Sequence, residues 1–340
     1  MIRLRDIALQ AEVSVMTVSK SLRDAKDISA ATKTRIKLLA QQMGYVPDRF
    51  AQALRTGQTK LFGVVISAMT NPVYSRILLA IEEHAHTLGY EVLLAHTLSN
   101  VEREETSIRR LLSRRVSGLF VAPVYRMGPE ARVYQEILDS KTPTIILGHT
   151  APFCRQFVSV QTDDLLASYA VTQHLIKLGH KRIAFFAGPP ATPWTQERFE
   201  GYRRALREYG LDVDDKLVFQ AGRTIEDGAK AALQMINETT GVTAVQAIND
   251  MVAVGCLKIL TEQGVKVPEQ ISIAGFGNIL LSEHCRVPLT TVRQPKFALG
   301  NAAVDSMMKL LRGEQPESRR LPAELIIRAS TAAAPGKAAK

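Results

Sequence analysis

The chain has 340 residues, of which 46% are hydrophobic and 22% charged, so it is long enough for two or three domains and too apolar to be disordered throughout. Its three cysteines stand far apart without a CxxC pair, which excludes a disulfide framework or a cysteine zinc site. The net charge is +10, and residues 1–60 hold 11 basic and 5 acidic residues against 32 and 28 in the other 280. A basic end on a nearly neutral body is typical of a protein that meets a polyanion, although charge alone is equally compatible with a solvated basic face.

The N-terminal segment carries charges within its first six residues and has no long apolar stretch, so we expect no export signal. No run of about 18 apolar residues occurs, and we therefore expect no membrane span. These features, together with the cysteine pattern, predict a cytoplasmic protein.

Three short helices are predicted within residues 1–46. The first has apolar residues at helical spacing over 4–11, the second follows Ser14 as its N-cap, and the third begins at Ser29 and stops at Gly44. Only a tight turn separates the first two helices. This arrangement is typical of a helix-turn-helix, in which the second helix enters the major groove of DNA.

The segment VSVMTVSKSL, residues 13–22, is the predicted recognition helix. With Val18 and Leu22 in the core, the residues that face outward are Val15, Met16, Ser19 and Lys20. There, small and apolar side chains can meet thymine methyl groups, and the Lys20 ammonium can reach guanine or phosphate. An ordinary three-helix bundle with Met16 in its core is the alternative. The predicted DNA-contacting residues of the first two helices are Arg5, Ser14, Val15, Met16, Thr17, Ser19 and Lys20.

The segment YVPDRFAQALRTGQTK follows Gly44 and contains a possible helix that begins at Pro47 and ends before Gly57. Helices shorter than about 12 to 15 residues are marginal in water, so we expect this one to be ordered only when something packs against it. A plain interdomain linker over residues 47–60 is the alternative.

Three stretches of the chain together resemble the lac repressor and galactose repressor (LacI/GalR) family of bacterial transcription regulators: RLRDIALQAEVSVMTVSKSL, SAATKTRIKLLAQQMGYVPDRFAQALRTGQT and GVVISAMTNPVYSRILLAIEEHAHTLGYEVLLAHT. The resemblance implies a homodimer that reads a pseudo-palindromic operator with Val15, Met16 and Lys20. It also implies that Leu54 wedges into the minor groove and kinks the duplex, with Ala51 and Arg49 on the same hinge segment.

The chain departs from the family pattern at two positions of the head. Many relatives carry glycine where Glu12 stands, and glutamate would be strained there if the turn needs a positive φ. Many also carry arginine where Lys20 stands, and lysine lacks the bidentate fork of arginine. The family's operator sequence therefore cannot be transferred to this chain.

Apolar runs alternate with helical stretches over residues 61–330, in two successive series. This alternation predicts parallel sheets covered on both faces, and hence two Rossmann-like lobes. The predicted fold is an all-α helix-turn-helix head and an α/β two-lobed core like that of periplasmic binding proteins. The first lobe is expected to span about 61–160 and 292–320, and the second about 163–290 and 321–330, before a flexible tail at 331–340.

Ligands of open α/β sheets bind beyond the carboxyl ends of the strands, so the loops after the apolar runs should line an effector site. An aromatic ring near arginine, asparagine and aspartate suits a polar, ring-shaped small molecule. His149 and Thr192 also lie in these loops, where a capping role is the simpler interpretation. The predicted effector-binding residues are Met69, Asn71, Tyr74, Tyr125, Arg126, Trp194, Arg198, Arg223, Asn249, Asp250 and Asn278.

The resemblance implies the same site, with Asn71 and Tyr74 in the first-helix effector segment, Arg198 as the family arginine, and Asn249 with Asp250 as the ND pair. Relatives often carry aspartate where Gly148 and Gly277 stand. The loss of both carboxylates, together with the arginines at 126, 198 and 223, favours an anionic effector such as a sugar acid or a phosphorylated sugar.

Enzyme motifs are weak in this chain. GFGN at 275–278 lacks the third glycine of a dinucleotide site, and we find no GxSxG, HExxH, P-loop or metal-ligand spacing. We therefore expect no catalysis, cofactor or metal. A two-lobed solute-binding protein is the alternative, but it is disfavoured by the basic head.

The stretch LTTVRQPKFALGNAAVDSMMKLLRGE resembles the family crossover that supplies a helix near the dimer face, and the tail has no leucine heptad. We expect a dimeric repressor of carbohydrate-utilisation genes, controlled by a sugar or sugar acid.

Overall fold

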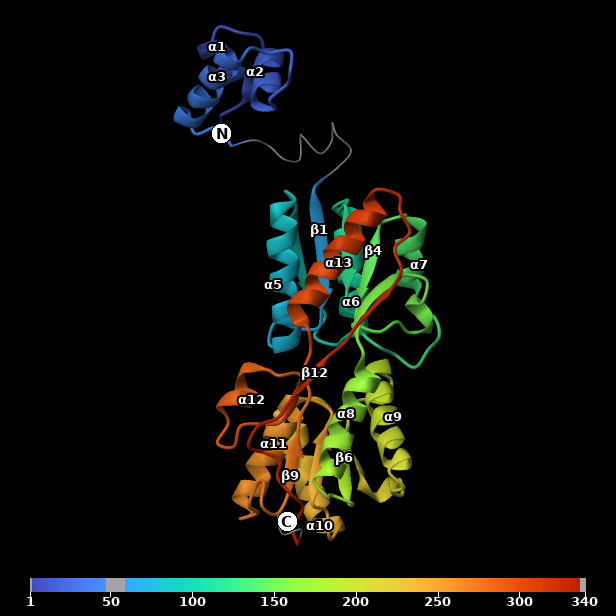
Figure 1. Ribbon diagram of the computed structural model, residues 1–340. Coiled ribbons are helices and arrows are strands. Elements are labelled where there is room, and N and C mark those ends of the chain that lie inside the picture. Colours follow the sequence, from blue (N-terminus) through green and yellow to red (C-terminus); the bar gives the residue numbers. More distant parts are fainter. Residues whose placement is uncertain (1, 47–58, 337–340) are drawn as a thin grey trace. The chain divides into compact units, whose positions relative to one another are not determined.

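The computed structural model describes residues 2–46 and 59–336, and the chain divides into two compact units, 1–59 and 60–340 (Figure 1). The predicted hinge residues Arg49, Ala51 and Leu54 lie outside the described residues.

The first unit contains three helices, α1 (Leu4–Gln10), α2 (Val15–Leu22) and α3 (Ala30–Gln42). The predicted caps are confirmed, since Ser14 Oγ accepts a hydrogen bond from the Thr17 amide at 3.0 Å and Ser29 Oγ accepts one from the Thr32 amide at 3.2 Å. The helices enclose an apolar cluster of Ile7, Ala8, Ala11, Val18, Ile36 and Ala40. This cluster fixes which face of α2 remains exposed.

The first lobe of the second unit is a parallel sheet in the order β11-β5-β4-β3-β1-β2. Alternate residues of β1 point to opposite faces of the sheet. Helices α5 and α13 cover one face and helices α6 and α7 cover the other, and each pair encloses its own apolar cluster (Figure 1). The strands are β1 (Leu61–Ile66), β2 (Glu91–His96), β3 (Gly118–Val121), β4 (Thr144–Leu147), β5 (Val158–Thr162) and β11 (Arg319–Leu321). The helices are α5 (Pro72–Thr87), α6 (Val101–Ser113), α7 (Arg132–Asp139) and α13 (Lys296–Leu311).

The second lobe is a parallel sheet in the order β7-β6-β8-β9, with a single large apolar core. Helices α10 and α11 pack closely at Gly255, which has no Cβ. A Cβ atom there would lie only 2.0 Å from the Ile225 carbonyl oxygen. The strands are β6 (Ile183–Ala187), β7 (Val218–Gln220), β8 (Ala244–Ala247) and β9 (Ser272–Ala274). The helices are α8 (Asp164–Lys177), α9 (Pro193–Glu208), α10 (Ile225–Glu238), α11 (Asp250–Glu262) and α12 (Leu280–His284).

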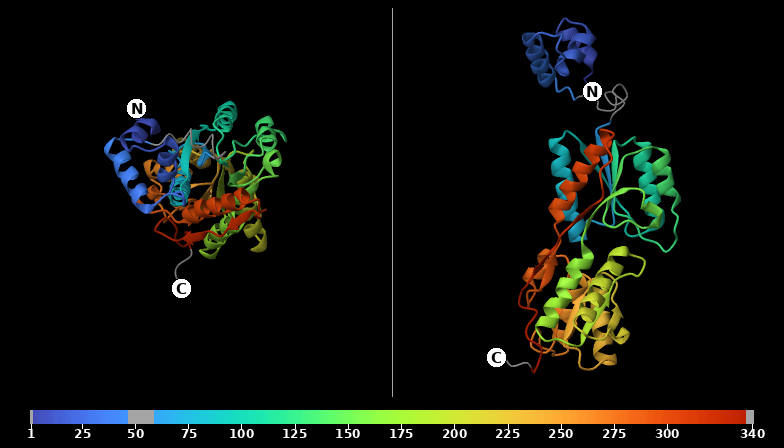
Figure 2. Two further views of the ribbon diagram at one scale, coloured as in Figure 1. Left: turned by 90° about the horizontal axis from the view of Figure 1, so that it is seen from above. Right: turned by 45° about the vertical axis from the view of Figure 1, so that its right-hand side comes forward.

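The chain passes between the lobes after β5, after β10 (Thr291–Arg293) and again between β11 and β12 (Glu324–Ile326). These crossing segments run side by side, since β10 pairs with β12 and β11 pairs with β5 (Figure 2). Gln294 Nε2 also donates to Thr162 Oγ1 at 3.1 Å, which joins two of the crossings. The lobes are therefore linked by a narrow bundle of strands.

The prediction of a flexible tail from residue 331 is wrong for its first part. The Ala332 amide donates to Ser272 Oγ at 3.0 Å, and the Ala334 amide donates to the Leu178 carbonyl at 3.0 Å. The Ile273 amide bonds to the Ser330 carbonyl in the same region. The tail backbone thus satisfies polar groups beside β9, which low sequence complexity did not reveal.

Within the described parts of the chain, no helix combines the length and the apolar character that crossing a bilayer requires.

In the turn between α1 and α2, Glu12 has a φ of 53°. This is a positive φ, the condition under which glutamate is strained at a position where many relatives carry glycine. Because this region penalises residues with a Cβ, Glu12→Gly should stabilise the head by about 0.5 to 1 kcal/mol. Amide hydrogen exchange of α1 and α2 in the full-length chain measures this change. Glu12→Ala removes the same charge but keeps the Cβ, and an equal gain from that variant would contradict the backbone explanation.

Candidate functional site

The exposed face of α2 carries the residues predicted to meet DNA. Met16 is 62% and Val15 43% exposed, whereas Val18 is fully buried. The alternative with Met16 in the core is therefore wrong. Met16 and Lys20 are four residues apart and share one face of the helix, and Arg5 on α1 is also exposed.

The outward position predicted for Ser19 is wrong, because its side chain is only 9% exposed. Arg23 covers it, with Nε 3.0 Å from the Ser19 carbonyl oxygen and Nη2 3.4 Å from Ser19 Oγ. Helical spacing alone did not show that a side chain one turn later would fold back over this position. The Thr17 hydroxyl lies 2.9 Å from Ser14 Oγ and belongs to the N-cap.

Loops that follow the strands of the two lobes come into contact in the second unit. Arg223, after β7, donates through Nη2 to Ser99 Oγ, after β2, at 3.0 Å. His149, after β4, has Nε2 3.0 Å from Glu197 Oε2 on α9 and 3.4 Å from Asp164 Oδ2. The carboxyl ends of the two sheets therefore face one another, the arrangement that α/β proteins use to bind ligands.

Glu197 takes part in a second contact between the lobes, an ion pair with Arg320 of β11. Burial raises the pKa of Glu197, but the close contact with His149 and the charge of Arg320 outweigh this effect, so that the pKa lies below its usual value. The Glu197 carboxylate is thus stabilised in its charged form by residues of the first lobe.

Arg198 is the buried centre of the second-lobe side, only 7% exposed. Its Nε and Nη2 lie 2.8 and 2.7 Å from Asp164 Oδ1, and Nη1 donates to the Ile248 carbonyl at 2.5 Å. Its guanidinium carbon lies 3.5 Å from the ring centroid of Phe276 and 5.0 Å from that of Trp194. Asp164 balances its charge, so Arg198 presents a stacked planar surface more than a free cation.

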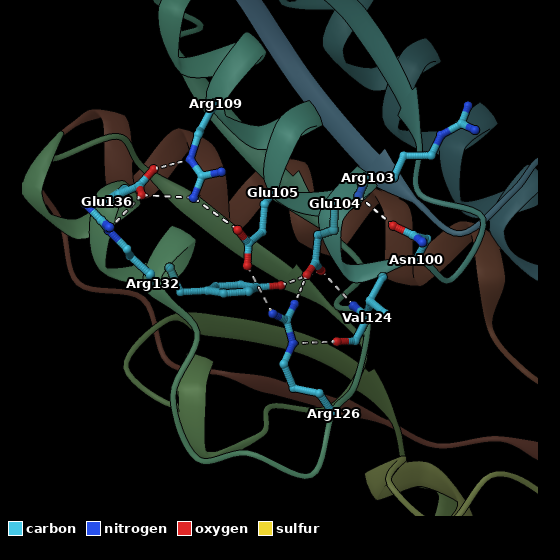
Figure 3. Close-up of polar contacts among 10 residues, drawn as sticks. Asn100, Arg103, Glu104, Glu105, Arg109, Val124, Arg126, Arg132 and Glu136 are labelled. Carbon is cyan, nitrogen blue, oxygen red and sulfur yellow. Dashed lines mark hydrogen bonds and ion pairs between the residues drawn. The ribbon is translucent and has the colours of Figure 1, made fainter.

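Arg126 points toward α6 (Figure 3). It pairs with Glu104, which is fully buried and also accepts hydrogen bonds from the Val124 amide at 2.7 Å and the Tyr134 hydroxyl at 2.9 Å. Burial raises the pKa of Glu104, and the Val124 amide and Arg126 oppose that rise. The predicted effector contact by Arg126 thus competes with a buried carboxylate partner, which lies 22 residues away in the sequence.

Tyr74 and Tyr125 lie on the first-lobe side of the contact region. The Tyr125 hydroxyl donates to the His149 carbonyl at 2.7 Å. Burial raises the pKa of Tyr74, and the charges of Arg223 and Arg198 lower it, so Tyr74 lies within electrostatic reach of the second lobe. Asn71 caps α5 by accepting from the Val73 amide at 3.0 Å, and Met69 before it is exposed.

The ND pair and Asn278 have structural partners. Asn249 caps α11 through the Val252 amide at 2.9 Å. Asp250 accepts from the Ile279 amide at 2.9 Å and from the Thr291 hydroxyl at 2.5 Å, and burial raises its pKa. Asn278 Oδ1 accepts from Arg328 at 2.8 Å. Asp250 and Asn278 therefore hold the loop after β9 in place through hydrogen bonds within the second lobe and its crossing segments.

Lys296 joins the first-lobe helix α13 to the same loop, because its Nζ donates to the carbonyl oxygens of Gly277 and, at 3.0 Å, of Asn278. The sequence pattern does not reveal this contact, nor the contacts made by Phe276, Ser99, Glu197, Asp164 and Arg320. Glu197 adjoins the family arginine, and Asp164 follows β5, a strand that the apolar pattern did not reveal. The remaining residues offered no signal, since their partners lie far away in the chain.

A helix-turn-helix head with an exposed recognition face, followed by a two-lobed core whose strand ends converge, is the architecture of a DNA-binding regulator with a periplasmic-binding-protein-like core. Residues 3–48 match the model described as "Bacterial regulatory proteins, lacI family", and residues 172–331 match "Periplasmic binding protein-like domain". The HTH-type transcriptional repressor CytR of Escherichia coli K12 is 32% identical over 334 residues, which cover 98% of this chain and 97% of that protein. The chain belongs to the lacI family of bacterial regulatory proteins, which are DNA-binding repressors and not enzymes.

Other repressors and regulators are similar to this chain over nearly their whole length. The ribose operon repressor of Escherichia coli K12 is 30% identical over 94% of this chain and 96% of its own length. The lac repressor dimer bound to operator and the anti-inducer ONPF has a TM-score of 0.87 at 29% identity, with 98% of this chain and 99% of that chain covered. The transcriptional regulator CelR in complex with cellobiose has a TM-score of 0.74 at 28% identity, with 97% and 100% covered.

The contact of Lys296 with the Gly277 loop predicts a pH-dependent stability. Burial lowers the pKa of Lys296 from 10.5 to about 8, which the charge of Asp250 partly opposes. Between pH 8 and 10.5 the unfolded chain then binds more protons at this site, so the free energy of unfolding should rise with pH, by about 1 to 3 kcal/mol. Urea unfolding measured against Lys296→Met isolates this contribution. Parallel curves for the two proteins over that range would contradict it.

Proposed function

We propose that this repressor is a homodimer that binds a pseudo-palindromic operator through Val15, Met16 and Lys20 of α2. Arg5, Ser14 and Thr17 add phosphate contacts, and Arg49, Ala51 and Leu54 of the hinge segment follow by resemblance. The exposure of Met16 on a helix whose other face is fully buried supports the first part. The operator-bound dimer of the lac repressor supports the second. The target lies on DNA, and we infer that the protein acts in the cytoplasm.

The observation that carries the effector proposal is the convergence of loops from both lobes around Tyr74, Tyr125, Trp194 and Arg198. This region offers aromatic faces, two phenol hydroxyls and the planar guanidinium of Arg198. Rings of moderate polarity suit such a surface. We infer that a small sugar-like molecule binds between the lobes.

The charge balance around this region favours a neutral effector over an anionic one. Of the three arginines that favoured an anion, Arg198 is balanced by Asp164 and Arg126 by Glu104. Relatives described with cellobiose and with ribose bind neutral sugars. A neutral sugar therefore replaces the sugar acid or sugar phosphate as the favoured effector.

Effector binding would act by shifting the lobes relative to one another. The apolar cores of the lobes are separate, so the contacts between them are few and mostly polar. A change in lobe arrangement alters the spacing of the first lobes across a dimer, and with it the ability of the two hinge segments to order on DNA. Linkage then requires operator and effector to change each other's affinity by the same factor.

Binding-site selection from random DNA with the full-length protein tests this function. We expect enrichment of a two-fold symmetric site, and a thermal shift with neutral sugars that exceeds the shift with the matching sugar acids and phosphates. Affinity for the selected site should then change on addition of the active sugar. Failure to enrich any symmetric sequence would refute the operator proposal, and shifts confined to anionic sugars would refute the neutral effector.

The contact of Glu197 with His149 and Arg320 holds the lobes together before the effector arrives. Glu197→Gln should lower effector affinity by about two- to fivefold, because part of the binding energy is then spent on bringing the lobes together. Isothermal titration with the sugar found by screening measures this loss.

Glu200→Gln is the matched control, since Glu200 is on the same helix but pairs with Arg207 within the second lobe at 3.2 Å. Equal effects of the two substitutions would mean that helix charge, and not the contact between lobes, is responsible.

A further inference from the structure

The loop between α2 and α3 brings a carboxylate onto the recognition helix. Asp27 Oδ2 lies 2.5 Å from Lys20 Nζ, and the two side chains are 56% and 38% exposed. The hydrogen bond from Lys20 is the main cause that holds the pKa of Asp27 below its usual value. The pair is therefore formed at neutral pH and lies at the surface of the head.

Asp27 lies beside the face proposed to meet DNA. Lys20 follows Met16 by four residues, and the exposed Met16 side chain marks that face. A carboxylate at this edge repels phosphates and has no charge partner among them. The presence of Asp27 calls for an explanation because every predicted DNA contact on α2 is neutral or basic.

We propose that Asp27 is a specificity-determining residue that holds the Lys20 ammonium in position for base recognition. The same ion pair reduces the binding free energy that Lys20 gains from contact with a phosphate alone. The proposal rests on the proposed function, in which α2 enters the major groove. It assigns to Asp27 a positioning role, exerted through Lys20, and predicts a larger effect on random DNA than on the operator.

The geometry of an ammonium group explains the difference. Lysine has three N–H donors, so Nζ can keep its bond to Asp27 and still donate to the O6 and N7 acceptors of guanine. Binding to a phosphate on random DNA instead exchanges one ion pair for another, which gains little. The Asp27 carboxylate also opposes close approach of the sugar-phosphate backbone. Both effects penalise nonspecific binding more than operator binding.

Asp24 provides a matched comparison in the same loop. Its carboxylate pairs with Lys37 of α3, with Nζ 2.6 and 2.7 Å from the two oxygens, and its pKa is lowered chiefly by that hydrogen bond. Asp24 has a φ of 57°, a conformation that asparagine tolerates well. Asp24→Asn and Asp27→Asn thus make the same charge change, but only the second releases a lysine of the recognition helix.

The experiment measures the affinity of the full-length protein for the selected operator and for a scrambled duplex of the same length and composition, over a range of salt. Asp27→Asn should raise affinity for the scrambled duplex by about three- to tenfold and operator affinity by less than twofold. The salt dependence for the scrambled duplex should steepen by about 0.9 log unit per log unit of salt, the value for one additional phosphate contact. Asp24→Asn should change both affinities by the same small factor.

The proposal is overturned if Asp27→Asn changes both affinities equally, or if Asp24→Asn reproduces its effect. Asp27→Glu keeps the charge and should retain low affinity for the scrambled duplex, which guards against a loss of folding in the asparagine variant.

Lys20→Met separates failure of this proposal from failure of the proposed function. Unchanged operator affinity in Lys20→Met would remove Lys20 from the DNA interface, and the Asp27 proposal with it. A lower operator affinity in Lys20→Met, combined with an unchanged operator-to-scrambled ratio in Asp27→Asn, would refute only the role of Asp27.

Discussion

The buried ion pair between Asp164 and Arg198 is the interaction on which the architecture of the core depends. Asp164 begins α8 directly after the first crossing between the lobes, and its burial raises its pKa while Arg198 opposes that rise. Either group alone would be an unpaired buried charge, which costs several kcal/mol. Arg198 in turn orders Trp194, Phe276 and the Ile248 carbonyl, and Asp164 comes within 3.4 Å of His149 of the first lobe. One pair therefore connects the crossing, the aromatic surface and the opposite lobe.

The rest of the core is consistent with the proposed movement of one lobe against the other. The two apolar clusters of the first lobe are separate from the single cluster of the second, so most hydrophobic stabilisation would be retained if one lobe moved against the other. What changes is a small set of polar contacts, among them Arg223 with Ser99 and Glu197 with Arg320. Partly exposed contacts of this kind contribute little individually. In the proposed function, the small sum of these contacts would let a bound effector shift the lobes between two arrangements.

Periodicity predicted most of the fold because the long helices bury one continuous apolar face each and the central strands are apolar on both faces. It missed β5, whose sequence VSVQT places Ser159 and Gln161 between apolar residues, and it missed the role of the tail, which bonds through backbone atoms that composition does not reveal. Side-chain roles were predictable only where the partner is close in sequence. The caps at Ser14 and Ser29 are of this kind, whereas Arg126, in the loop after β3, pairs with Glu104 of helix α6, 22 residues earlier.

Gly148 and Gly277 stand where many relatives carry aspartate, and their backbone conformations differ from those that aspartate favours. Their φ values of 108° and 138° lie where residues with a Cβ are strained, so aspartate could enter only with a shift of the backbone. At Gly277 a new carboxylate would also lie next to Asp250, since a Cβ there is 3.4 Å from Asp250 Oδ2. The two glycines therefore differ from aspartate in backbone conformation as well as in the missing carboxylate. If an effector binds between the lobes as proposed, its recognition would come from the stacked surface around Arg198 and from the tyrosine hydroxyls, which select ring shape more than the pattern of hydroxyl groups.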